Sequence, residues 1–145
     1  MATSQTTPPS TDLVYTEPAL TAELLERFDT FAREVALHDG VSAFSEQTRI
    51  ELTKALRERT LTPPRFFLAE DGGTIAAAFV ALTPVSDEDG GVIEAAVAPA
   101  YRGRGAGSAF FEHAVRQLGE DAVRYRLWVH GSANDTGIET PAHAF

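Results

Sequence analysis

The chain has 145 residues, enough for one domain with a hydrophobic core and too few for two ordinary domains. Its formal net charge of -9 argues against a broad surface for nucleic acid or for an anionic membrane. Because the sequence contains no cysteine, it has no disulfide framework, thiolate nucleophile or thiolate metal site. Because the net charge is negative, any anionic ligand must be held by a local feature of the structure, against the overall charge of the protein.

Residues 1–12 are polar and contain prolines, which predicts a disordered tail before a folded domain at 13–145. The start lacks the basic and apolar regions of a signal peptide, and no run approaches the ~18 apolar residues of a membrane span. The four histidines show no ligand spacing, so we expect no metal site. These features predict a soluble cytoplasmic protein.

The first half of the domain predicts one short strand and two helices. "LVYT" at 13–16 is typical of a strand, and a helix follows Pro18, with Thr21 as its N-cap and Gly40 as its C-terminal stop. A second helix is expected from Ser45 to about Arg59. The apolar face of the first helix is formed by Leu24, Phe28, Phe31 and Val35.

The second half predicts a β-hairpin followed by a strand–helix–strand unit. "RFFLAE" and "TIAAAFVALT" flank the turn Asp71-Gly72-Gly73, for which we expect positive φ angles. A strand at 92–98 is followed by a helix that runs to about Gly119, and a further strand is expected at 124–130. Such a unit makes the two strands parallel, so the fold class is α/β with a mixed sheet and helices on its faces. The apolar face of that helix is predicted to contain Phe111, Val115 and Leu118.

Between this strand and helix lies the cluster "AYRGRGAGS", which combines two arginines with three glycines. A helix N-terminus offers unpaired N–H groups, glycines allow an anion to approach the backbone, and arginines suit phosphate oxygens. The cluster is neither a P-loop nor a dinucleotide fingerprint, because the required Gly-Lys-Ser/Thr and the third glycine are missing. What fits is Arg-x-x-Gly-x-Gly, with Arg102, Gly105 and Gly107. The structural alternative is a glycine-rich turn that only packs a helix on a sheet.

This motif resembles the pyrophosphate signature of the GNAT N-acetyltransferases, and the order of the surrounding elements matches as well. "HDGVSAFSEQ" and "RLWVHGSANDT" further resemble the amino-terminal half of the mycothiol synthase family of actinobacteria. The resemblance implies the GNAT fold, acetyl-CoA as co-substrate without a metal, and acetyl transfer to the cysteinyl amine of the glucosamine-inositol precursor of mycothiol. Rival interpretations are another small-molecule N-acetyltransferase and a non-catalytic acyl-CoA-binding half-domain.

The resemblance also implies roles for individual residues. Glu94 is a candidate general base, and its alternative is a strand glutamate that is solvated or paired with an arginine. Glu46 would contact the amine substrate, although it also fits an acid at the start of a helix. The strand at 92–98 would offer backbone groups to the pantetheine arm of acetyl-CoA, and the glycine-rich loop after it would hold the pyrophosphate. The cofactor-binding residues implied in this way are Ala95, Ala96, Val97, Arg102, Gly103, Arg104, Gly105, Ala106, Gly107 and Ser108.

The chain departs from the family pattern in two respects. The loop reads Arg-Gly-Arg where the family often has consecutive arginines, which leaves one charge fewer for the phosphates. A GNAT domain ordinarily continues beyond the last strand predicted here, so we expect a fragment without its C-terminal strands and without turnover on its own. In the resembling family a second GNAT domain follows in the same chain.

Overall fold

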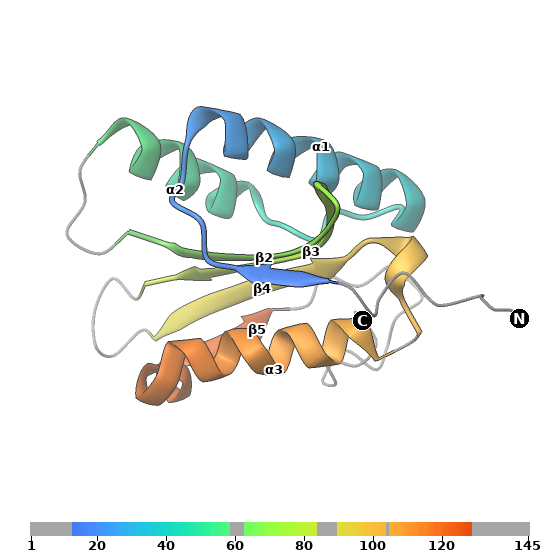
Figure 1. Cartoon of the computed structure of the whole chain (residues 1–145). Helices are drawn as coiled ribbons and strands as arrows, with labels where there is room; N and C mark the ends of the chain where they lie inside the picture. Colours follow the sequence, from blue (N-terminus) through green and yellow to red (C-terminus); the bar gives the residue numbers. More distant parts are fainter. Residues whose placement is uncertain (1–12, 59–62, 84–89, 104, 129–145) are drawn as a thin grey trace, which may run out of the picture.

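The computed structural model describes residues 13–58, 63–83, 90–103 and 105–128. A five-stranded sheet forms the middle layer, with α1 and α2 on one face and α3 on the other (Figure 1). The predicted tail at 1–12 lies outside the described residues. None of the described helices is long and apolar enough to cross a membrane. The strands are β1 (Val14–Thr16), β2 (Arg65–Asp71), β3 (Thr74–Leu82), β4 (Gly91–Val97) and β5 (Tyr125–Trp128).

The helices begin where the sequence predicts, because their capping residues are local signals. α1 (Ala22–Asp39) is capped by Thr21, whose Oγ1 accepts a hydrogen bond from Leu24 N at 3.0 Å, and it ends at Gly40 with φ of 78°. α2 (Glu46–Arg57) is capped by Ser45 and ends two residues before the predicted limit. α3 spans Ala106–Leu118. Short 3-10 turns, η2 (Pro99–Tyr101) and η3 (Gly119–Arg124), flank α3 and were not predicted.

The sheet has the predicted mixed topology. The strands lie in chain order, the first four are antiparallel, and β4 pairs with β5 in parallel. In the hairpin, Gly72 and Gly73 have the expected positive φ angles, but Asp71 does not belong to the turn. It is the last residue of β2 and pairs with Thr74, so a two-residue turn joins the strands.

Two hydrophobic clusters fill the space on either side of the sheet. The predicted face of α1 is confirmed, since Leu24, Phe28, Phe31 and Val35 are all buried. The predicted face of α3 is confirmed at Leu118, but its centre lies part of a turn away from the prediction. Phe110, Ala114 and Leu118 form its buried row, while Phe111 and Val115 are half-buried beside it. Because this row faces the sheet, Phe111 and Val115 lie at the side of the contact and are only partly covered.

Candidate functional site

The described pairing of β4 with β5 is shorter than its pairing with β3, because the described part of β5 stops at Trp128. The pairing with β5 runs from Gly91–Tyr125 to Glu94–Trp128, whereas the pairing with β3 continues to Val97. Because Ala98 N donates to Ala76 O at 2.8 Å, even-numbered residues of β4 direct their backbone groups toward β3. The odd-numbered residues direct theirs to the other edge. Of the three predicted strand residues, Ala95 and Val97 therefore face this edge, and the backbone of Ala96 is directed to β3.

The glycine turn leads from this edge to the start of α3. Gly103 and Gly105 have φ angles of 79° and 81°, and Gly105 is the N-cap of α3 without a side-chain capping bond. The first helical bond runs from Ala109 N to Gly105 O at 3.0 Å. The N–H groups of Ala106, Gly107 and Ser108 precede that bond and so have no partner within the helix. Arg104 lies outside the described residues, so its predicted contact with phosphate stays a prediction.

Arg102 is held by protein groups on both ends of its guanidinium. Nε donates to Val97 O at 2.9 Å, while Nη1 and Nη2 donate to the two carboxylate oxygens of Asp39 at 2.8 Å each. Asp39 is the last residue of α1, 63 positions away in the chain. The sequence predicted Arg102 as a phosphate ligand and gave no sign of this pair, because nothing local connects the two residues.

The pairing with Arg102 has a pH-dependent consequence for Asp39. Hydrogen bonds from Arg102, followed by those from His38, lower the pKa of Asp39 below its ordinary value of 3.8, and partial burial opposes them. A carboxyl whose pKa is lower in the folded state stabilises the fold above its unfolded pKa, and this contribution is lost as the pH falls through the folded value.

We therefore expect the free energy of unfolding of Asp39→Asn to lie below that of the unsubstituted chain by a constant amount near neutral pH. The difference should shrink in acid, below the ordinary pKa of 3.8. Urea unfolding of both proteins across a pH series measures it. A difference that stays the same into strong acid would show that the charge of Asp39 contributes nothing.

Glu94 joins β4 to the start of α2. Its side chain is only 2% exposed, and Oε1 accepts hydrogen bonds from Ser45 N at 2.8 Å and from Thr48 Oγ1 at 2.5 Å. Ser45 Oγ in turn donates to Thr48 Oγ1 at 3.2 Å. The carboxylate thus caps the helix from the neighbouring strand, a contact that the sequence did not predict. A catalytic role for Glu94 stays a prediction.

Glu46 is the first residue of α2 and is exposed. It directly follows Ser45, whose N–H is bound by Glu94, the last β4 residue with a described β5 partner. The start of α2 therefore lies beside the middle of β4. The contact of Glu46 with the acceptor stays a prediction.

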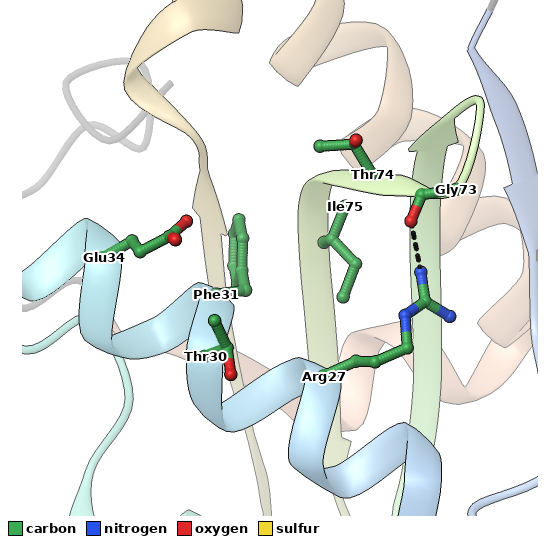
Figure 2. A pocket seen from close by; sticks show the side chains of 7 residues that line it. All are labelled: Arg27, Thr30, Phe31, Glu34, Gly73, Thr74 and Ile75. Carbon is green, nitrogen blue, oxygen red and sulfur yellow. Dashed lines mark hydrogen bonds between the residues drawn. The ribbon is translucent and has the colours of Figure 1, made fainter.

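A separate hollow of about 260 Å³ lies between α1 and the β2–β3 turn (Figure 2). Arg27 crosses its margin, where one of its nitrogens donates to Gly73 O at 2.9 Å and to Glu70 at 2.6 Å. None of its lining residues belongs to the predicted site, and among the described residues no group of three His, Cys, Asp or Glu side chains could hold a metal. We therefore place the candidate site at the β4 edge and the glycine turn.

Curated relatives of this chain have one name in common. A mycothiol acetyltransferase from Rothia mucilaginosa (strain DY-18) is 82% identical over 132 residues, which cover 91% of this chain and 37% of that protein. A mycothiol acetyltransferase from Nocardia farcinica (strain IFM 10152) is 40% identical over 93 residues, or 64% of this chain and 27% of that protein. The chain thus spans well under half the length of these curated relatives. The predicted resemblance to mycothiol synthase is confirmed.

A predicted acetyltransferase from Clostridium acetobutylicum, crystallised with acetyl-CoA, has a similar fold. The TM-score is 0.58 at 14% identity, over 91% of this chain and 86% of that chain. The sequence model of the acetyltransferase (GNAT) family matches residues 23–140, which include β4, the glycine turn and α3. The chain therefore belongs to the GNAT acetyltransferase family.

Proposed function

We propose that the chain binds acetyl-CoA and belongs to a cytoplasmic enzyme that transfers the acetyl group to a small-molecule amine. The acceptor we propose is the cysteinyl amine of 1D-myo-inositol 2-(L-cysteinylamino)-2-deoxy-glucopyranoside, in mycothiol biosynthesis. Membership of the GNAT family supports the reaction class, and the identity of 82% with a mycothiol acetyltransferase supports the acceptor. That relative is much longer than this chain, which fits a second GNAT domain in the same protein.

The single observation that carries the proposal is the presence of two sets of backbone donors, one on β4 and one at the start of α3. Ala95 and Val97 direct their backbone groups away from β3, and Ala106, Gly107 and Ser108 have N–H groups without a partner within the helix. A pantetheine arm can pair with the first set as an added strand does, while a pyrophosphate suits the second. The two sets together match a ligand that is amide-bearing at one end and anionic at the other.

The transfer joins the amine nitrogen of the acceptor to the thioester carbonyl carbon and breaks the bond from that carbon to sulfur. Coenzyme A leaves as its thiolate. The attacking ammonium group loses two protons in all, one to supply the lone pair and a second on forming the amide. The part assigned to this chain is to hold and orient the thioester along β4. Fixed N–H groups of the strand edge also suit the negative charge that develops on the carbonyl oxygen.

Glu46→Gln tests the acceptor assignment. We expect acceptor affinity to fall by about ten- to a hundredfold, because the variant loses charged hydrogen bonds to sugar hydroxyls or to the substrate ammonium. The affinity for acetyl-CoA should barely change, because a residue that contacts the acceptor is not expected to contact the phosphates of the cofactor. Two calorimetric titrations of the purified chain measure the two affinities, one with the cysteinyl-glucosaminyl-inositol acceptor in the presence of coenzyme A and one with acetyl-CoA alone.

Glu23→Gln provides a control, because it makes the same change at an exposed carboxylate in the first turn of the other helix on this face of the sheet, α1. It should leave acceptor affinity close to that of the unsubstituted chain. If Glu46→Gln binds the acceptor as tightly as the unsubstituted chain, Glu46 is only an acid at a helix start and the acceptor assignment fails.

A further inference from the structure

The segment between β4 and the glycine turn is held from both sides by aspartates of distant elements. Tyr101 Oη donates to Asp71 Oδ2 at 2.6 Å, at the end of β2. Arg102, the next residue, is bound by both oxygens of Asp39 at the end of α1. In Figure 1 this segment rises beside the end of α1 before the chain descends to α3. The approach to the glycine turn is therefore fixed before any ligand binds.

The contacts of Arg102 hold two distant parts of the fold together, so its guanidinium is not a free cation. Its fork meets the carboxylate of Asp39 in a bidentate pair, and its Nε binds the carbonyl of Val97, five residues back. Both side chains are mostly screened from solvent, with exposed fractions of 28% for Arg102 and 24% for Asp39. The charge of Arg102 is thus neutralised by the protein itself, next to a turn that is expected to bind an anion.

We propose that Asp39 is a positioning residue of the coenzyme A site, acting through Arg102. By holding the guanidinium against Val97 O, it sets the course of the chain toward the start of α3, where the N–H groups of Ala106, Gly107 and Ser108 would face the pyrophosphate. This inference rests on the proposed function. Its consequence is that the carboxylate of Asp39 favours the binding of an anion, although its own charge repels one.

A double-mutant cycle tests the proposal. Coenzyme A is titrated by calorimetry into the unsubstituted chain, Asp39→Asn, Arg102→Gln and the double variant. We expect each single variant to lose about tenfold in affinity for coenzyme A and the double variant to lose no more. Either change breaks the same ion pair between Asp39 and Arg102. Arg102→Lys should lose as much as Arg102→Gln, because lysine keeps the charge but not the planar fork.

The control is Glu17→Gln, which removes another bidentate carboxylate–arginine pair, with Arg65, at 2.8 and 2.9 Å. Arg65 pairs with Ala81, toward the opposite end of the sheet, so affinity for coenzyme A should not change. Thermal unfolding of each variant confirms that the protein titrated is folded.

Two results would overturn the proposal. Tighter binding by Asp39→Asn, with Arg102→Lys close to the unsubstituted chain, would make Arg102 a direct phosphate ligand that Asp39 restrains. Unchanged affinity in both single variants would make the pair irrelevant to the site. If the folded, unsubstituted chain binds no coenzyme A, the proposed function fails instead, and the two failures are thereby distinguished.

Discussion

Gly105→Val is expected to lower affinity for coenzyme A by roughly a hundredfold, the largest effect of any single change in the glycine turn. Gly105 has a φ of 81°, and a Cβ built on it meets nothing within 4 Å. The fold therefore has room for the side chain, at a conformational cost of roughly 1–3 kcal/mol. In the proposed complex the added bulk would stand between the anion and the N–H groups of Ala106 and Gly107. Calorimetric titration with coenzyme A measures the loss.

Gly119→Val is the matched control. Gly119 lies at the other end of α3, also has a positive φ, at 66°, and also has open space around a built Cβ. This variant should be destabilised but should bind coenzyme A as the unsubstituted chain does, provided that it is titrated below its unfolding temperature. Equal losses of affinity in the two variants would mean that strain in the helix, and not blocked access at Gly105, weakens binding.

Glu94→Ala is expected to lower the free energy of unfolding by about 3 kcal/mol. The change removes the carboxylate oxygen that accepts hydrogen bonds from the N–H of Ser45 and the hydroxyl of Thr48. Because Glu94 and Thr48 are buried, solvent does not readily replace these bonds. Glu94→Gln should recover most of this loss, because an amide oxygen can accept the same two hydrogen bonds. Urea unfolding of the three proteins measures the differences. Equal stabilities would show that the link between β4 and α2 contributes nothing.

The same pair of variants separates the two roles considered for Glu94. A general base contributes about a hundred- to ten-thousandfold to a rate, and glutamine abolishes that contribution while keeping the shape. An acetyl-transfer assay of an active protein containing this chain would therefore show a large loss in Glu94→Gln if Glu94 takes the proton. Retained activity in Glu94→Gln, with loss in Glu94→Ala, would assign it to holding the start of α2 in place.

The fold could be predicted from the sequence wherever its causes are local. Thr21 and Gly40 mark the ends of α1 because a hydroxyl cap and a left-handed residue act within one helical turn. The strand–turn–helix–strand order similarly determines the parallel pairing of β4 with β5. The buried face of α3 was harder, because apolar residues cover more than half of its circumference. Only its contact with the sheet selects the row of Phe110 and Ala114.

At the candidate site the geometry of the glycine turn could be predicted from the sequence, but the side-chain contacts around it could not. The glycine turn was recognisable because positive φ angles and a helix start leave a compact pattern in the sequence. The pair of Asp39 with Arg102 and the bonds of Glu94 to α2 span 63 and up to 49 positions. They depend on how α1 and α2 cross the sheet, and no local pattern records that packing. The sequence alone therefore did not show that the charge of Arg102 is paired with Asp39.

The central claim is that the β4 edge and the glycine turn together bind coenzyme A. Isothermal titration of coenzyme A into the purified chain, with circular dichroism to confirm that it is folded, tests this claim most directly. We predict saturable binding with one molecule per chain, weakened by Gly105→Val and not by Gly119→Val. A folded chain that gives no binding heat at several temperatures, and that coenzyme A does not stabilise against thermal unfolding, would contradict the claim.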